Sequence, residues 1–346
     1  MSYAAFWTAS YDGSSWYRAT QPAAALGWRG HQTWCAELLP ASVVAKADAI
    51  VGSRVATEDA SAQWAAMKAA GKRLILDLDD DYFGVEERNT NAYGFWSKPD
   101  VQARLIANTL LADVVTVASD RIGNAVARAL SHRGDGYPVT DGWPTIVTIE
   151  NGLHAGMLAI PRDYDPEVLT IGWAGTASTA NDFDLVVPAL DKIMHYCRRI
   201  GRKARLLLVG LPSGHPGLHQ LGAEHDVHHC EWAAPVEIYH SIISQFDIWV
   251  APYRSNSFTD AKFPTKALEA GMFGIPLIAS DIPPYAEWGR EVLTVPSDQP
   301  WMWGRYLKNL VDRAEDRRAR GEAARARASR NILQGIAGQW EQVLFP

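Results

Sequence analysis

The sequence predicts an α/β protein made of two doubly wound domains. Short apolar strands alternate with predicted helices in both halves of the chain, a pattern typical of parallel sheets covered by helices on both faces. A chain of 346 residues is long enough for two domains, each with its own core. Residues 155–166 contain two prolines and little periodicity, so we interpret this segment as the linker between the domains.

In the first half, apolar runs of strand length are separated by longer segments of helical character. The predicted strands are 4–9, 49–52, 73–78, 114–118 and 145–149. The predicted helices are 16–26, 58–70, 99–111 and 120–131. Strand 73–78 is the strongest of these, and it runs directly into three aspartates.

The second half repeats the alternation. The predicted strands are 168–173, 204–210, 246–251, 275–279 and 291–295. Helices are predicted at 183–200 and 236–244, with a terminal helical region from Trp301. A further short helix has Pro264 in its first turn and Gly274 as its stop.

The composition excludes several classes of protein. The net charge of −6 argues against a generally basic nucleic-acid binder. Three scattered cysteines are too few for a disulfide framework, which favours a reducing cytoplasm. The N-terminal segment lacks the basic region of a signal peptide, and no apolar run approaches the ~20 residues of a membrane-spanning helix.

Segment 260–280 is the most informative part of the chain. Lys262 and Lys266 lie at the start of the predicted helix, where cations oppose the helix dipole. That placement is explained if free amides and both ammonium groups bind a phosphate. Glu269, three residues after Lys266, would then lie near the ribose hydroxyls of a nucleotide. The alternative is a surface helix with an ordinary Lys–Glu pair, and spacing alone does not separate the two.

Two other loops in the second half could contact the same anion. The small residues Gly175, Thr176 and Ala177 follow a predicted strand and could admit a phosphate. The alternative is an ordinary turn with Asn181 or Asp182 as a helix cap, and no dinucleotide-binding glycine motif is present. Arg254, just after another strand, could reach the same phosphate.

The aspartate run 77–81 follows a strand in the first half and is open to three interpretations. It could bind a divalent ion, it could contact amides or sugar hydroxyls, or Asp77 could be a phosphatase nucleophile with Asp79 as acid and base. Asp81 stands where the phosphatase pattern requires Thr or Val, which disfavours the third. Capping of the next loop is the structural alternative.

Segment 12–18 is the other candidate in the first half. Its polar residues could bind an acceptor or a phosphate, or could simply begin a helix; they include Ser14, Ser15, Tyr17 and Arg18. A separate group in the second half, His225, His228, His229 and Cys230, could bind metal, but no second ligand cluster accompanies it. We therefore predict no metal site.

Together these segments resemble the GT-B glycosyltransferases, in particular the retaining group called family 4. Family members have a stretch that begins with lysine or glutamate, followed by a helix ending in Glu-Ala, then Gly-x-Pro and an apolar strand. The corresponding residues here are Lys262, Lys266, Glu269, Ala270, Gly274, Pro276 and 277–280. Segment 77–83 resembles a subgroup found in bacteria and phages.

The resemblance implies two Rossmann-like domains whose parallel sheets face across a cleft. Residues 1–158 would form the acceptor domain, 167–325 the donor domain, and 326–346 a C-terminal helix that crosses back to the first domain. Glu269 would bind the ribose, and Lys262, Lys266 and Arg254 the diphosphate. Gly175, Thr176 and Ala177 would open the donor domain, Asn151 would belong to the Asn-Gly signature before the linker, and 12–18 would lie near the acceptor.

The implied reaction is retaining, metal-independent sugar transfer from a nucleotide-diphosphate sugar, without a tightly bound cofactor. Lys262 and Lys266 would stabilise the leaving diphosphate, while Asp79, Asp80 or Asp81 would orient the acceptor or the sugar. The acceptor would be a glycan or a small molecule, with a modified DNA base as an alternative. One family position departs: Ala261 stands where family members have an earlier glutamate. A non-catalytic nucleotide-sugar-binding protein and a metal-dependent transferase therefore stay as alternatives.

Overall fold

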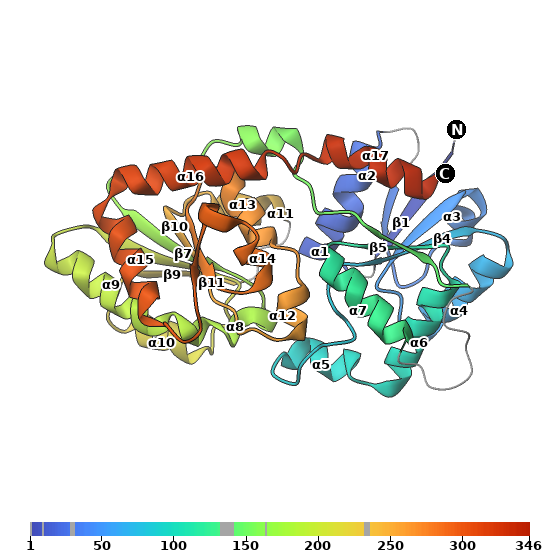
Figure 1. The fold of residues 1–346 in the computed structure, drawn as a ribbon, viewed down its shortest axis with the longest axis horizontal. Helices are drawn as coiled ribbons and strands as arrows, with labels where there is room; N and C mark the ends of the chain where they lie inside the picture. Colours follow the sequence, from blue (N-terminus) through green and yellow to red (C-terminus); the bar gives the residue numbers. More distant parts are fainter. Residues whose placement is uncertain (1, 9, 28–31, 132–141, 163–164, 232–235) are drawn as a thin grey trace. The chain divides into compact units, whose positions relative to one another are not determined.

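The computed structural model describes residues 2–8, 10–27, 32–131, 142–162, 165–231 and 236–346. The chain forms two compact units (Figure 1). Unit 1 comprises Met1–Ala155, Ala261–Phe263 and Asn331–Pro346, whereas unit 2 comprises Gly156–Asp260 and Pro264–Arg330. Three residues of the predicted donor domain thus belong to unit 1. No helix among the described residues is long and apolar enough to cross a membrane.

Unit 1 is built on a six-stranded parallel sheet in the order β2-β1-β3-β4-β5-β6. Its strands are β1 (Ala4–Thr8), β2 (Gln32–Cys35), β3 (Ala49–Ser53), β4 (Arg73–Leu78), β5 (Val114–Val117) and β6 (Thr145–Thr148). Strand β2 pairs with one edge of β1, and the next strand in the chain, β3, pairs with the other edge. The carboxyl ends of β1 and β3 therefore flank the switch point where doubly wound sheets bind ligands.

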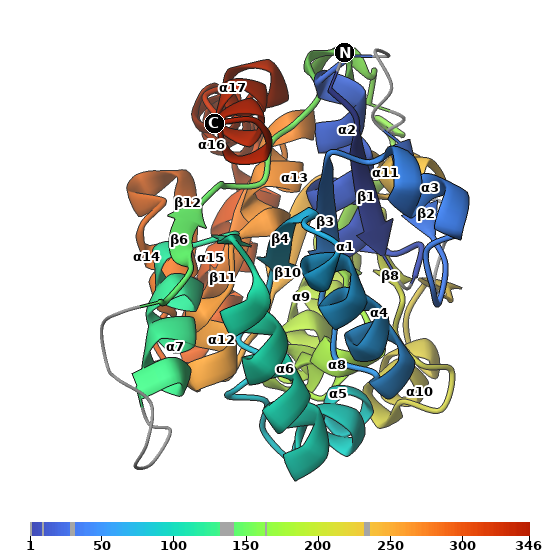
Figure 2. The ribbon, with the colours of Figure 1, turned by 90° about the vertical axis from the view of Figure 1, so that its right-hand side faces the viewer.

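Helices cover both faces of this sheet. They are α1 (Gly13–Ser15), a π-helical turn (Trp16–Thr20), α2 (Gln21–Ala25), α3 (Ala41–Lys46), α4 (Glu58–Ala69), α5 (Thr90–Trp96), α6 (Pro99–Leu111), α7 (Asp120–Ser131) and α17 (Leu333–Leu344). Helices α4 and α6 lie side by side on one face (Figure 2). Helix α17 buries Trp340 and Ile336 with Phe6 and Ile75 of the opposite face, so the end of the chain is part of the core of unit 1.

Unit 2 contains a second six-stranded parallel sheet, in the order β12-β11-β10-β7-β8-β9. Its strands are β7 (Leu169–Ala174), β8 (Ala204–Val209), β9 (Val227–Cys230), β10 (Ile248–Ala251), β11 (Leu277–Ser280) and β12 (Val292–Val295). Counted within the unit, this is the order 3-2-1-4-5-6 of dinucleotide-binding sheets. Its switch point lies between β7 and β10.

The helical elements of unit 2 vary from single turns to 15 residues. They are the 3-10 helices Ala155–Ala159, Phe183–Leu185 and Gly289–Glu291, and α8 (Ala177–Ala180), α9 (Val187–Arg199), α10 (Pro216–Gly222), α11 (Val236–Ile243), α12 (Ser257–Ala261), α13 (Thr265–Phe273), α14 (Pro283–Ala286), α15 (Trp301–Asp312) and α16 (Ala314–Ala328). Apolar residues of α9 and α15, among them Leu190, Ile193 and Leu307, pack against Ile171 and Leu208 of the sheet.

Most predicted strands and helices match the observed ones to within about two residues, a difference expected at element ends. The structure adds the short elements β2, β9, α3, α5, α8, α10 and α12. The first helix begins at Gly13 rather than at Trp16, and the terminal helical region is three helices. Pro264 is the N-cap of α13 and not part of its first turn, while Gly274 is the left-handed C-cap, as predicted.

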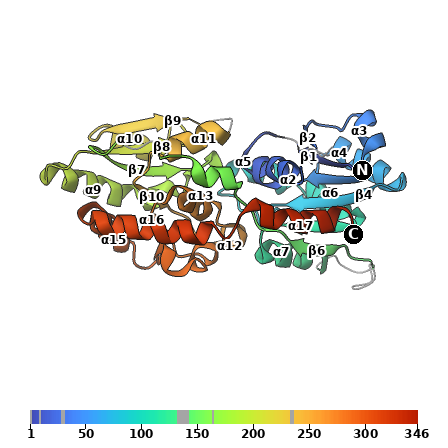
Figure 3. The same cartoon turned by 90° about the horizontal axis from the view of Figure 1, so that it is seen from above.

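Helix α13 packs unusually close to α16, and the two run beside each other in unit 2 (Figure 3). Residues 267–273 of α13 are all buried. A Cβ atom at Gly321 of α16 would lie 2.0 Å from the Gly274 carbonyl oxygen, and one at Gly271 would lie 2.6 Å from the Ala324 carbonyl oxygen. Glycine is required at both contacts because backbone meets backbone there.

We expect Gly321→Ala to lower the free energy of unfolding by about 1–3 kcal/mol, because two backbones must move apart to admit the methyl group. Urea denaturation followed by circular dichroism measures the change. Gly304→Ala in α15 is the matched control, since no atom lies within 4 Å of its Cβ position. Wild-type stability in Gly321→Ala would show that the helices are not packed this closely.

Candidate functional site

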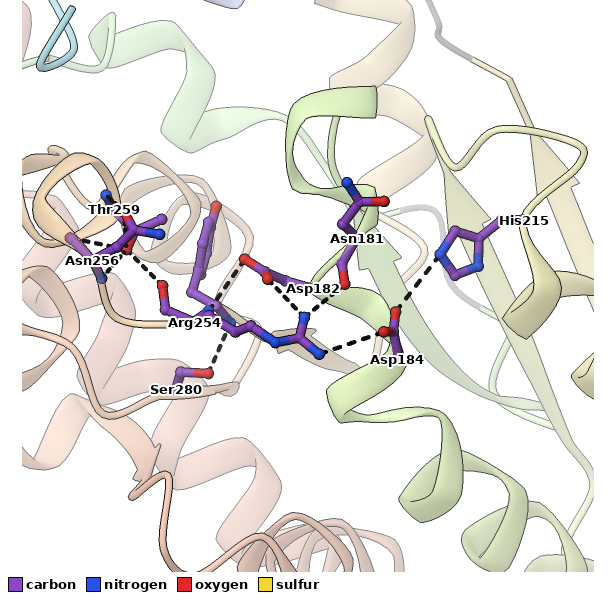
Figure 4. Close-up of polar contacts among 9 residues, drawn as sticks. Asn181, Asp182, Asp184, His215, Arg254, Asn256, Thr259 and Ser280 are labelled. Atoms are coloured by element: carbon purple, nitrogen blue, oxygen red, sulfur yellow. Dashed lines mark hydrogen bonds and ion pairs between the residues drawn. The ribbon is translucent and has the colours of Figure 1, made fainter. Parts of the chain in front are cut away.

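At the switch point of unit 2, the loops after β7 and β10 are joined by Arg254 (Figure 4). Nη1 of Arg254 donates to Asp182 Oδ1 at 2.9 Å and to the Asn181 carbonyl oxygen at 2.7 Å. Its Nη2 lies 3.4 Å from Asp184 Oδ2. Two carboxylates already balance the charge of Arg254, so its contacts are those of a residue that holds two loops together. None of these contacts joins Arg254 to Lys266.

The small-residue loop after β7 is also ordered by contacts within unit 2. Gly175 is buried, and a Cβ atom there would lie 2.5 Å from Thr179 Oγ1 and 2.6 Å from the Trp173 ring. Thr176 caps α8 by a reciprocal pair of hydrogen bonds with Thr179. Ala177 is the first residue of α8. Asp182 stands at the N-cap position of the 3-10 helix Phe183–Leu185, as the alternative interpretation expects, but its side chain makes no capping hydrogen bond. Local packing alone explains the glycine at 175.

A cluster of polar side chains surrounds Lys266 and Glu269; we call it the α13 cluster, and it also contains Tyr239, Tyr253 and Tyr285. Lys266 Nζ donates to Tyr253 Oη and lies 4.9 Å from the centroid of the same ring. Tyr239 Oη donates to Glu269 Oε2 at 2.9 Å. Burial, a hydrogen bond with Tyr253 and the charge of Glu269 raise the pKa of Tyr285 well above its ordinary value. The predicted Lys266 and Glu269 are thus gathered with three tyrosines that sequence patterns did not identify.

His240 borders this cluster but carries no charge at neutral pH. Its Nε2 lies 3.9 Å from Glu269 Oε1. Burial lowers the pKa of His240 to about 4, so the imidazole is neutral at pH 7 and the contact is not an ion pair. Glu269 is itself buried, and its carboxylate is stabilised by donors such as Tyr239 rather than by a paired imidazolium.

Lys262 does not belong to the helix that contains Lys266, contrary to the prediction that both begin one helix. Helix α12 ends at Ala261 and α13 begins at Thr265, so Lys262 lies between two helices. Within unit 1, Lys262 Nζ donates to Asp80 Oδ1 at 2.5 Å. Ala261 is buried in an apolar cluster of unit 1, and its carbonyl oxygen accepts from Ser119 Oγ at 2.6 Å.

The switch point of unit 1 is bridged in the same manner as that of unit 2. Arg54, which follows β3, donates to Ser10 Oγ and to Asp12 Oδ2, each at 3.2 Å, in the loop after β1. Arg54 has φ of 56°, in the left-handed region that non-glycine residues rarely adopt. Such strain is concentrated at functional sites. No local pattern singles out Arg54, because neither its partners nor its φ can be read from neighbouring residues.

The predicted carboxylates Asp79 and Asp80 lie in the Asp79 cluster, which we define as Ser14, Arg54, Asp79, Asp80 and Lys262. Burial would raise the pKa of Asp79, but the charge of Arg54, hydrogen bonds from Ser14 and Tyr82, and the charge of Lys262 lower it below its ordinary value. Burial and the neighbouring Asp79 charge raise the pKa of Asp80 to about 6, against the effect of Lys262. One carboxyl is thus ionised at neutral pH while its neighbour titrates near pH 6, a pattern found in acid–base sites.

The remaining predicted residues of unit 1 are structural in their observed contacts. Asp81 is buried, which raises its pKa, and its Oδ1 accepts from the backbone N–H groups of Phe83 and Gly84 at 3.1 and 3.0 Å. Ser15 pairs with Asp12 in the cap of α1. Tyr17 is buried in the turn that follows.

Arg18 is only 1% exposed, and its guanidinium is used entirely within unit 1. Nη2 donates to Asp77 Oδ1 at 2.7 Å, and Nη1 donates to Asn151 Oδ1 at 3.2 Å and to the Ile149 carbonyl oxygen. Thr116 Oγ1 donates to the same Asp77 oxygen at 2.7 Å. Direct contact of Arg18 or Asn151 with an acceptor does not fit this burial, and the buried Asp77 is not placed as a phosphatase nucleophile.

The histidines 225–229 do not gather around one point. His228 Nε2 lies 3.1 Å from Asp226 Oδ1, and His229 Nε2 lies 2.6 Å from the Leu211 carbonyl oxygen. His225 Nε2 instead lies 2.9 Å from Asp191 Oδ1 of α9. The sequence grouping of these residues with Cys230 as one ligand set therefore does not describe the structure.

Comparisons with known proteins agree with this architecture. Residues 168–313, which span most of unit 2 and include α13, match the family described as glycosyl transferases group 1. No curated protein matches the chain significantly. The fold is similar to those of several solved structures at low sequence identity.

Three of these structures cover most of the chain. HepE of Anabaena in complex with UDP-glucose has a TM-score of 0.68 at 14% identity, with 99% of both chains covered. A glycosyltransferase from Rickettsia africae has a TM-score of 0.64 at 14% identity, again with 99% of both chains covered. The UDP-forming alpha,alpha-trehalose-phosphate synthase of Burkholderia xenovorans has a TM-score of 0.60 at 13% identity, over 97% of this chain and 80% of that one.

The predicted GT-B fold is confirmed by two six-stranded parallel sheets with surrounding helices. Residues 168–313 of this fold match the glycosyl transferases group 1 family, and this match supports a transferase. The similar solved structures share 12 to 14% identity with this chain, so they establish the fold and leave the substrate open.

The Asp80 carboxyl should titrate with an apparent pKa of about 6, raised from 3.8 by burial and by Asp79. Because the folded-state pKa is the higher one, protonated Asp80 stabilises the protein below pH 3.8, and this contribution is lost as the pH rises through about 6. NMR of ¹³C-labelled carboxyl groups measures the titration directly.

Lys262→Met should raise the pKa of Asp80 further, since Lys262 lowers it, while Lys262→Arg keeps the charge and should leave the pKa close to the wild-type value. A wild-type pKa near 4, unaffected by Lys262→Met, would contradict the observed burial and pairing.

Proposed function

We propose that the protein is a retaining, metal-independent glycosyltransferase that binds a nucleotide-diphosphate sugar on unit 2. The observation that carries the proposal is the placement of Lys266 and the buried Glu269 three residues apart on α13, within one group of tyrosines. This helix lies within the segment that matches the glycosyl transferases group 1 family. UDP and UDP-glucose in the HepE complexes make a uridine nucleotide the first candidate donor.

The start of α13 has the chemistry needed for a diphosphate. Pro264 at the N-cap has no side-chain acceptor, and its carbonyl oxygen accepts from the Ala267 amide at 2.9 Å. The helix dipole favours an anion at this end. Lys266, the second residue of α13, adds a full positive charge there. Lys266 would stabilise the negative charge that develops on the diphosphate as the sugar leaves.

Glu269 is suited to the ribose of the same nucleotide. A buried carboxylate needs donors, and Tyr239 supplies one of them to Oε2. A pair of ribose hydroxyl groups can donate to a carboxylate in the same way. We infer that Glu269 binds these hydroxyl groups while Tyr239 holds its carboxylate in position.

The Asp79 cluster of unit 1 is the proposed acceptor site, with Asp80 as the group that accepts or orients the acceptor hydroxyl. Arg54 and Lys262 place two positive charges beside the carboxylates of Asp79 and Asp80. These charges balance the two carboxylates, a task that a divalent cation would otherwise perform. The cluster therefore favours metal-independent transfer over the metal-dependent alternative. Lys262 is assigned here to Asp80 rather than to the diphosphate.

Lys266→Met and Glu269→Gln should each weaken UDP binding by about 10- to 100-fold, the loss expected for one charge-assisted contact. Isothermal titration calorimetry measures both. Lys266→Met should weaken inorganic pyrophosphate equally, whereas Glu269→Gln should leave pyrophosphate affinity unchanged, because only the lysine contacts phosphate.

Lys308→Met and Glu237→Gln are the matched controls, since both side chains are exposed and lie outside the α13 cluster. If UDP fails to bind, the other nucleoside diphosphates take its place in the same series. Unchanged nucleotide affinity in both Lys266→Met and Glu269→Gln would overturn the donor site.

A further inference from the structure

Helix α9 and the segment after α10 bring two imidazoles and two carboxylates together in unit 2. Asp191 and His195 are four residues apart on α9 and so lie on the same face of that helix. Glu224 and His225 follow α10 and meet this face from the neighbouring segment. None of these four residues belongs to the α13 cluster, and the group is independent of the proposed transfer reaction.

Asp191, His195 and His225 offer ligand atoms that all lie within 4.8 Å of one another, and Glu224 approaches His195 as a fourth candidate. His225 Nε2 lies 2.9 Å and His195 Nε2 lies 3.6 Å from the same oxygen, Asp191 Oδ1. His195 Nε2 lies 3.3 Å from Glu224 Oε2. Ligands bound to zinc at about 2.0–2.2 Å in a tetrahedron are spaced by about 3.3–3.6 Å, so small movements of Asp191, His195 and His225 suffice. The exposed Glu224 side chain must move further to become the fourth ligand.

One candidate ligand, His225, is buried, whereas His195 and Glu224 face solvent. The His225 side chain is 1% exposed, and its ring packs edge-on against that of His195 with centroids 4.8 Å apart. His195 is 46% exposed, and Glu224 is more so. A buried imidazole is held in orientation before binding, while the exposed side of the cluster lets an ion enter from solvent.

The charge of Arg198 opposes a cation at this cluster. Its Nη2 lies 3.4 Å from His225 Nδ1 and donates to the Glu224 carbonyl oxygen at 2.5 Å. Binding of a metal through Nε2 leaves the ring proton on Nδ1, so the guanidinium must turn away. Arg198 is exposed and can do so, but its charge should weaken metal binding.

We propose that Asp191, His195, His225 and Glu224 bind one divalent cation of the zinc type. Two imidazole nitrogens with two carboxylate oxygens suit Zn²⁺ and exclude the all-oxygen sites that Mg²⁺ and Ca²⁺ prefer. The ion joins α9 to the segment that leads into β9, and so fixes the edge of the sheet of unit 2. Its role is structural.

The test is titration of the metal-free protein with zinc chloride by isothermal calorimetry. We expect one equivalent to bind, and zinc in about 100-fold excess over Kd to raise the melting temperature by about 5 °C. His195→Ala should weaken zinc binding by at least about 10-fold. His228→Ala is the matched control, since His228 is 54% exposed and lies outside the cluster, and it should bind as wild type does.

Arg198→Leu should bind zinc about 2- to 5-fold more tightly, because a nearby positive charge is removed. This gain distinguishes the proposed site from adventitious binding elsewhere on the surface. The proposal is overturned if zinc does not bind at a free concentration of about 100 µM, if His195→Ala binds as tightly as wild type, or if Arg198→Leu binds more weakly.

Discussion

The close packing of α13 against α16 is the constraint on which the proposed donor site depends. Glycines at 271 and 321 let the two backbones meet, and residues 267–273 are buried as a result. A helix buried to this extent has few positions for polar side chains. Lys266 and Glu269 occupy such positions and are met by tyrosines from α11, from the loop after β10 and from α14. Backbone contact on one side of α13 thus fixes the charges on its other side.

Both units use an arginine to bridge the switch point of their sheets. Arg254 joins the loops after β10 and β7, and Arg54 joins the loops after β3 and β1. In each unit the arginine lies in the loop after the strand that neighbours the first strand. It pairs with a carboxylate in the segment that follows the first strand. Parallel strands leave their carboxyl ends side by side at this point, so loops meet there and a charged pair can hold them in place. The two units share this arrangement although the strand orders of their sheets differ.

Much of the fold follows from local sequence pattern, because strand and helix periodicity in 73–78, 99–111 and 120–131 is strong and agrees with the tertiary packing. The same holds for Lys266 and Glu269, whose spacing on one helix is a local property. Arg54 and Tyr253 were not predicted because their roles depend on which strands become neighbours. Lys262 was predicted at a helix start, but it lies between α12 and α13: Ala261–Phe263 belong to the other unit, and no local pattern marks such a change.

Arg18 shows the converse problem. A polar motif after a first strand is a reasonable candidate for ligand binding, yet here Arg18 balances Asp77 inside the core of unit 1. A buried charge pair and a ligand-binding pair use the same residue types, so only burial separates them. The same argument applies to Asn151, which accepts from Arg18.

The most direct test of the account is whether the purified protein cleaves a nucleotide sugar. A panel of nucleotide-diphosphate sugars is incubated with the protein and a chelator, and the released nucleoside diphosphate is quantified. The account predicts release from at least one donor, unchanged by the chelator, through slow hydrolysis or faster transfer to an added acceptor. Tight nucleotide-sugar binding without release from any donor, or release that requires an added divalent ion, would contradict it.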